Sequence, residues 1–467
     1  MGELTFPILT ICIALPLFAT LAASHARARS IAIAALSITL ALFLEILRQV
    51  LASGGGALAE PSGLPFFADK LNAVPMVLLT GLALVTVIAA PRRDVNRGFL
   101  VRLLILTAGT LAAYAASNLP MFLIGWIASA LPLVFRPGGQ SGNRMPAFVL
   151  GGSALVLTVA VVLIGTEGGD AASLSITGLP LSGGRSALGL LVLAVILRER
   201  LFPFHRATVA LFTGGPVLLA LLLVNSQLGL FLLARVAMPL LGEAAAGMLP
   251  WLGGLGLFTA LYTAVMGIVQ REPRQLLAML IASQSAALLA GLATASHEGI
   301  AGAFAQWIVL GVASTVLIAV YRSVEARIDA PLDRPGFMGL GSRLPRLAVF
   351  FAISGLTLVG LPGTLGFAGE DLLLHGVLAH YAWWGAALPV AIALNAYHAF
   401  RLFARLFLGK DTITKNTVAD ALPRERWALT ACLAFLVWGG LVPGRVISLQ
   451  APATSSLAHT PEPVRHP

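Results

Sequence analysis

Long apolar runs separated by short polar gaps constrain the fold of this chain more than any other feature of its sequence. A helix needs about 20 apolar residues to cross the core of a bilayer, and about 14 runs approach that length. Hydrophobic residues occupy 58% of the 467 positions and charged residues only 11%, too few to cover a soluble protein of this size. We therefore predict an all-α, polytopic membrane protein that forms one transmembrane domain over residues 1–467. The runs lie at residues 5–23, 31–47, 74–90, 99–116, 119–135, 147–164, 187–209, 217–233, 252–269, 276–293, 301–321, 347–361, 383–400 and 427–442.

The remaining composition argues against several other classes of protein. A formal charge of +10 does not indicate nucleic-acid binding here, because the basic residues are spread over short gaps and are not gathered on one face. Cys12 and Cys432 lie inside apolar runs, so we expect neither a disulfide framework nor a thiolate metal site. We find no cofactor motif and no phosphate-binding loop, and we expect no catalytic site in this chain. Glu3 stands where a signal peptide would be positive, so we interpret the first run as the first span.

Lysine and arginine are distributed unequally between alternate gaps. Most of the 30 basic residues follow odd-numbered runs, for example Arg92, Arg271 and Arg322. Cytoplasmic loops retain such residues, and an even number of spans places both termini on one side. We predict a multi-pass protein of the bacterial inner membrane with both termini outside the cytoplasm.

Proline and glycine interrupt two of the runs. The seventh carries Pro203 near its middle, and the twelfth continues into Pro362, Gly363, Gly366 and Gly369. An interrupted helix at membrane depth frees backbone groups that only protein or a wet cavity can satisfy, and transporters place ion paths at such points. We predict broken helices at runs seven and twelve. The alternative is two ordinary kinks.

Three charged residues stand close together in the seventh run. Arg198, Glu199 and Arg200 precede His205, and each charge costs about 2.5 to 3.5 kcal/mol at the centre of a spanning helix. Neighbouring helices or water must compensate them, and their consecutive positions demand several partners. In the alternative interpretation the span ends at Leu197, and the charged residues form a cytoplasmic loop.

Two carboxylates and a histidine follow the second break. Glu370 and Asp371 come directly after the glycine-rich segment, with His375 nearby. A carboxylate buried beside an interrupted helix can exchange protons, whereas the same pair could also be solvated loop acids at the outer surface. Glu45 and His398 are more simply a residue that reaches the membrane interface and a helix-packing histidine.

Three segments resemble the proton-channel membrane subunits of complex I and of multisubunit cation/proton antiporters. LRERLFPFHRATVALFTGGP is similar to the segment around the family's broken seventh helix, with Arg198 at the position of a lysine and with Pro203 and His205 matching. QREPRQLLAMLIASQSA resembles a second family motif, in which Gln284 is in place. FFAISGLTLVGLPGTLGFAGEDLLLHG is most similar to the subunit M type, and Glu370 matches its glutamate.

The resemblance implies a fold, a setting and a type of mechanism. It implies an antiporter-like core at about residues 99–408 with peripheral helices at 1–98 and 409–467, embedded among other membrane subunits and the lipid bilayer. It also implies proton or ion translocation along a buried axis of polar residues, in a complex such as NADH:quinone oxidoreductase. The candidates for this pathway are Arg198, Glu199, His205, Gln227, Glu370, Asp371 and His375.

The chain departs from the family pattern at several positions of that axis. Ala128 stands where the fifth-helix glutamate is expected, Gln227 stands near the eighth-helix lysine, and Ala313 near the eleventh-helix lysine. Arginine at position 198 keeps its proton, whereas a buried lysine can release it. Two alternatives therefore stay open. One is a non-conducting structural paralogue in such a complex, and the other is the membrane partner of an inorganic carbon uptake system that works with a cytoplasmic protein.

Overall fold

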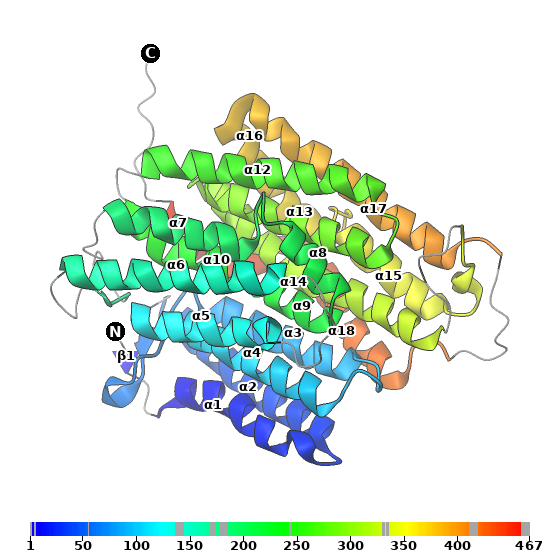
Figure 1. Cartoon of the computed structure of the whole chain (residues 1–467), viewed down its shortest axis with the longest axis horizontal. Coiled ribbons are helices and arrows are strands. Elements are labelled where there is room, and N and C mark those ends of the chain that lie inside the picture. The colour runs from blue at the N-terminus through cyan, green and yellow to red at the C-terminus, as the bar shows by residue number, and fades with distance from the viewer. Residues whose placement is uncertain are drawn as a thin grey trace.

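The chain forms a bundle of long helices that run side by side in a computed structural model (Figure 1). The predicted all-α fold is confirmed, and every predicted apolar run falls on a helix or on an interrupted helix. The structure describes residues 2–3, 6–54, 56–135, 144–168, 174–176, 185–241, 245–328, 332, 336–410 and 419–458.

Most helices are continuous. In the first third of the chain these are α1 (Ile8–Leu21), α2 (Ala28–Ala52), α3 (Ala73–Ala89), α4 (Arg97–Ala115), α5 (Leu119–Val134) and α6 (Met145–Gly168). Later in the chain they are α12 (Ala245–Val269), α13 (Pro273–Leu292), α14 (His297–Arg327), α17 (Ala387–Phe407), α18 (Pro423–Leu441), α19 (Pro443–Ser448) and α20 (Ala451–Leu457).

Three segments are interrupted. The predicted breaks in runs seven and twelve are confirmed, because α7 (Arg185–Glu199) is followed by α8 (Arg206–Thr213), and α15 (Pro345–Thr357) by α16 (Leu365–Tyr381). The third break was not predicted: α9 (Val217–Asn225) stops before α10 (Leu228–Leu232), which continues through a π-helical turn (Leu233–Ala237) into α11 (Met238–Leu241). Short 3-10 turns lie at Ala22–Ser24, Pro61–Gly63, Leu340–Ser342 and Ala382–Ala386.

A small three-stranded sheet lies beside the bundle. Strand β1 (Gly2–Glu3) pairs in parallel with β2 (Leu58–Ala59), and β2 pairs antiparallel with β3 (Phe67–Ala68). Each strand has only two residues, so the sheet ties the chain's start to the segment between α2 and α3 and contributes little to the core.

Burial separates inner helices from outer ones. The 31 residues of α14 lie at the centre and contact α3, α9, α13, α15, α16 and α18. The most apolar stretch of α14 is 100% buried, whereas that of α6 is only 39% buried. Large apolar side chains such as Phe148 and Leu155 on α6, and Trp251 on α12, are mostly exposed on the outside of the bundle. Such a surface suits lipid and not water.

Helix length agrees with a membrane setting. Among the described residues, 8 helices are long and apolar enough to cross a membrane by length and composition. Four shorter apolar helices, which include α1, α3, α5 and α15, accompany them. The number of bilayer crossings, predicted at about 14 from the lengths of the apolar runs, stays a prediction.

Candidate functional site

The first part of the candidate site is the break between α7 and α8. Helix α7 ends at Glu199, and Arg200 adopts a left-handed conformation with φ of 57°. Pro203 follows three residues before the start of α8 and has no backbone N–H to donate. The chain thus leaves helical geometry over a few residues inside the bundle.

The charged residues at this break are buried. Arg198, Glu199 and Arg200 are 1%, 6% and 3% exposed. The interpretation of these residues as a cytoplasmic loop is therefore wrong, because a loop at the surface would leave their charged ends in solvent. The protein must compensate two cations and one anion within its own interior.

Arg198 contacts neutral groups of α5. Its Nη2 donates to Ser129 Oγ at 2.6 Å and its Nη1 to the Trp126 carbonyl at 3.4 Å. The guanidinium also lies 4.8 Å from the Trp126 ring centroid, which adds a cation–π contact. Ala128 lies on the same helix, at the position where the family resemblance implied a glutamate, so no carboxylate stands there.

Glu199 caps the second half of the broken eighth segment. Gln227 is left-handed with φ of 43°, so α10 begins anew with unpaired backbone N–H groups. Glu199 Oε1 accepts from the N–H groups of Gly229 at 2.8 Å and Leu230 at 3.3 Å. A Cβ at residue 229 would lie 2.6 Å from that oxygen, so the close approach requires glycine. The carboxylate is therefore fixed at the positive end of a half-helix.

The first half of the same segment is capped by side chains from two other helices. The Tyr114 hydroxyl of α4 donates to the Ser226 carbonyl, and Trp307 Nε1 of α14 donates to the Asn225 carbonyl at 3.0 Å. The Asn225 amide in turn donates to Ser314 Oγ at 3.0 Å. These bonds satisfy carbonyls that the break would otherwise leave unpaired in an apolar interior.

Helix α13 connects this region with the second break. Ser285 Oγ lies 3.4 Å from Glu199 Oε2 and exchanges hydrogen bonds with the Gln227 amide at 2.8 and 3.2 Å. The adjacent Gln284 donates through Nε2 to the Leu358 carbonyl at 2.9 Å, just beyond the end of α15. Two neighbouring residues of one helix thus reach both interrupted regions.

Glu370 lies in the second turn of α16, and its side chain reaches back to the second break. It is 8% exposed, and its Oε2 lies so close to Gly360 that a Cβ there would overlap it. Gly360 has φ of 77°, a conformation that also favours glycine. Within the described part of the chain, Glu370 Oε1 and both amide atoms of Gln306 have no hydrogen-bond partner. Gln306 faces Gly369, where a Cβ would lie 3.0 Å from its Oε1.

The other candidates are not all gathered at these breaks. Asp371 and His375 lie 3.5 Å apart on the exposed side of α16, with side chains 52% and 69% exposed. His205 is 6% exposed, and its ring packs 4.9 Å from that of Tyr262. Glu370, Glu199 and Gln227 are thus interior groups, whereas Asp371 and His375 lie at the surface.

The two residues assigned structural roles each have a partner in the structure, and the position of Glu45 at the membrane interface stays a prediction. Glu45 pairs with Arg48 at 2.6 Å on the exposed side of α2. His398 is fully buried, and its Nε2 lies 2.6 Å from the Ala264 carbonyl, in a helix-to-helix contact.

Sequence reasoning missed the residues that hold the broken segments together. These are hydroxyl, amide and indole groups within apolar runs: Tyr114, Ser129, Asn225, Ser285 and Trp307. Each places a polar atom within an apolar run, and a single such residue only weakly indicates a buried hydrogen bond. The triplet Asn225, Ser226 and Gln227 is a stronger one, because three consecutive polar residues in the middle of a span need partners.

Comparisons with known proteins give a consistent picture. Residues 116–394 match the family model described as NADH:quinone oxidoreductase/Mrp antiporter, TM. Subunit M of NADH-quinone oxidoreductase from Rickettsia typhi is 24% identical over 391 residues, which is 80% of this chain and 78% of the relative. The Rhodobacter capsulatus subunit M is 24% identical over 418 residues, 83% of this chain and 81% of the relative.

Solved structures share the fold. A chain of respiratory complex I from Thermus thermophilus aligns with a TM-score of 0.84 at 22% identity, covering 96% of this chain and 99% of that one. A chain of the Mrp complex from Dietzia sp. aligns with a TM-score of 0.80 at 17% identity, covering 97% of each. The interrupted helices therefore belong to a fold that occurs in large membrane assemblies.

Proposed function

The chain belongs to the NADH:quinone oxidoreductase/Mrp antiporter family of membrane subunits, and from that premise we propose that it is a proton- or ion-translocating subunit of an energy-coupled membrane complex. The observation that carries this proposal is the pair of breaks that hold buried ionisable groups and are bridged by Gln284 and Ser285 of α13. Irregular backbone at membrane depth is tolerated where it lines a path for ions.

Glu370 is the group to which we assign proton exchange. It combines burial with an oxygen that lacks a hydrogen-bond partner within the described residues, and its side chain lies against Gly360 in the glycine-rich segment before α16. An intramembrane carboxylate with these properties can bind and release a proton without breaking a fixed ion pair. Arg198 and Glu199 act instead as fixed charges, because their partners hold them in single geometries.

The experiment compares two neighbouring carboxylates of α16. Glu370→Gln removes the buried acid, and Asp371→Asn makes the same kind of change on the exposed side. In vesicles that contain the intact complex, we expect Glu370→Gln to abolish energy-coupled proton uptake, measured with a pH-sensitive dye, while the subunit still assembles. Asp371→Asn should leave uptake unchanged. Unchanged uptake in Glu370→Gln removes that residue from the mechanism.

One observation favours a second candidate, a non-conducting structural subunit. Arg198 is held by Ser129 and the Trp126 carbonyl, both neutral, and Ala313 is a fully buried alanine in α14. Helices that lack proton-exchanging groups at those two positions can still pack together in a complex. If the complex assembles normally and native vesicles show proton uptake that no substitution in this chain alters, the structural role is the correct one.

The setting of the subunit is part of the proposal. We propose that it lies in a bacterial inner membrane with both termini outside the cytoplasm, with an antiporter-like core at about residues 99–408 and peripheral helices on either side. The named relatives with known structures are chains of larger complexes, which supports other membrane subunits as partners. A cytoplasmic partner protein would fit the inorganic carbon uptake alternative.

A further inference from the structure

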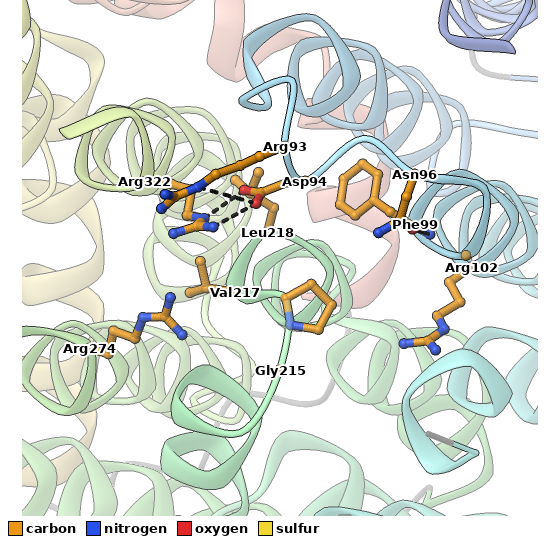
Figure 2. A pocket seen from close by; sticks show the side chains of 12 residues that line it. Arg93, Asp94, Asn96, Phe99, Arg102, Gly215, Val217, Leu218, Arg274 and Arg322 are labelled. Carbon is orange, nitrogen blue, oxygen red and sulfur yellow. Dashed lines mark hydrogen bonds and ion pairs between the residues drawn. The ribbon is translucent and has the colours of Figure 1, made fainter. Parts of the chain in front are cut away.

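A cavity of about 270 Å³ lies away from the two breaks, where several helix ends meet (Figure 2). It is bounded by the segment between α3 and α4, the turn between α8 and α9, the start of α13 and the last turns of α14. We call it the arginine cavity. Its lining residues are Arg93, Asp94, Asn96, Gly98, Phe99, Arg102, Gly215, Pro216, Val217, Leu218, Arg274 and Arg322.

The arginine cavity carries more positive than negative charge. Arg322 donates to both oxygens of Asp94 at 2.6 Å, and Glu325 accepts from Arg322 at 2.5 Å and from Arg274 at 2.8 Å. The carboxylates of Asp94 and Glu325 therefore offset four guanidinium groups, those of Arg93, Arg102, Arg274 and Arg322. Arg102 has no hydrogen-bond or ion-pair partner within the described part of the chain, and it lies on the other side of the α9 start from Arg274 and Arg322 (Figure 2).

The first turn of α9 adds the positive end of a helix to this cavity. Pro216 precedes the helix and provides no side-chain cap. The first backbone N–H of the helix that has an acceptor is that of Leu219, which donates to the Pro216 carbonyl at 3.0 Å. The N–H groups of Val217 and Leu218 therefore belong to an uncapped helix start whose residues line the cavity. Helix α4 also begins here, but its start is already capped, because the Phe99 N–H donates to Asn96 Oδ1 at 2.8 Å.

We propose that the arginine cavity binds a phosphate-bearing anion, either the phosphodiester head of an anionic lipid or free phosphate. Guanidinium groups on several sides and an open helix start are the recurring means by which proteins hold phosphate oxygens. The cavity is sheltered, because the side chains of Arg274 and Arg322 are only 19% and 14% exposed. A sheltered site strengthens such contacts.

Arginines at cytoplasmic helix ends also serve simply to orient a membrane protein. That role requires neither a cavity nor an uncapped helix start directed at it. A neighbouring basic cavity of about 370 Å³ shows the contrast, because the helix that starts at it, α4, is capped by Asn96, whose Oδ1 accepts from the Phe99 N–H at 2.8 Å. The arginine cavity differs in that the start of α9 has no such side-chain cap.

The test uses the purified full-length chain in an uncharged detergent and three probes: phosphatidylglycerol, phosphatidylcholine and inorganic phosphate. Lipid retention is measured by native mass spectrometry and phosphate binding by equilibrium dialysis. Arg102→Gln is the informative variant because it breaks no internal ion pair, and Arg27→Gln is the matched control, since Arg27 is exposed and lies outside the cavity lining. Loss of one charge-assisted contact should weaken binding about tenfold.

We expect native protein and Arg27→Gln to bind the phosphate group alike, and Arg102→Gln to bind it about tenfold more weakly, with further weakening at high ionic strength. Preference for phosphatidylglycerol over phosphatidylcholine without phosphate binding identifies a lipid head, and binding of inorganic phosphate identifies a free anion. Arg93→Gln, which changes a half-exposed lining residue, serves if Arg102→Gln does not fold. Equal binding by native protein and both cavity variants, or no preferential binding of either probe, overturns the proposal.

Discussion

Replacing Glu199 by glutamine should destabilise the protein strongly although the two side chains have nearly the same shape. The carboxylate accepts two backbone hydrogen bonds at the start of α10 and lies 3.9 Å from the Arg200 guanidinium, with both side chains 2% exposed. Hydrogen bonds to a charged group contribute about 1.5–3 kcal/mol each and neutral ones about 0.5–1.5, so two bonds lose about 2 kcal/mol in total. Leaving a buried cation without its partner brings the expected loss to about 3–5 kcal/mol.

The assay is unfolding of the purified chain by SDS titration in detergent, followed by tryptophan fluorescence. Glu45→Gln is the matched control, because Glu45 makes its ion pair with Arg48 on the exposed side of α2. The Glu45→Gln variant should therefore unfold like the native protein. In the double variant Glu199→Gln/Arg200→Gln the loss should be smaller than the sum of the two single losses, since the unpaired cation is gone. If Glu199→Gln unfolds with native stability, the carboxylate does not cap the broken segment and the reasoning fails.

Two further predictions concern a hydrogen bond to the broken eighth segment and a close contact between α14 and α16. Tyr114→Phe should cost about 1–3 kcal/mol, because the Ser226 carbonyl loses its donor inside the bundle; native stability in the SDS titration would contradict this. Gly302→Ala should cost about 1–3 kcal/mol, because its Cβ would overlap the Leu373 backbone where α14 meets α16. Gly254→Ala, at a position with open space around it, should cost nothing, and equal effects of the two glycine substitutions would show that the close contact is unimportant.

The positions of the helices could be predicted because hydrocarbon leaves little choice. A span must satisfy its backbone hydrogen bonds internally, so a long apolar run between polar gaps is a helix. Pro203 and the glycines near residue 363 marked two breaks by their own backbone chemistry, since proline lacks a donor and glycine accepts positive φ. The break at Gln227 has no proline, and a left-handed glutamine cannot be read from the sequence.

The burial of the charged residues depended on contacts that no local pattern contains. Arg198 lies in the interior because Ser129 and Trp126, some 70 positions earlier, accept its hydrogens, and Glu199 lies there because α10 begins beside it. Without these partners the same three residues would be a plausible surface loop. The decisive interactions join segments far apart in the chain.

Helix geometry explains why the candidates near residue 370 separate. Consecutive residues of a helix point about 100° apart, so Glu370 and Asp371 cannot both face the same neighbour. Asp371 and His375 are four residues apart and pair with each other on the exposed side. Predicting that α16 is a helix would have sufficed to divide the group, but the sequence left open whether the residues after the glycines form a helix or a surface loop.

The proposed function requires that the helices cross the bilayer in the predicted order, and labelling with a membrane-impermeant thiol reagent tests that arrangement most directly. In a background without Cys12 and Cys432, single cysteines replace Arg92, in the segment after α3, and Glu298, at the start of α14; both positions are exposed. We expect Arg92→Cys to react only from the cytoplasmic face and Glu298→Cys only from the opposite face. Reaction of both from the same face would contradict it.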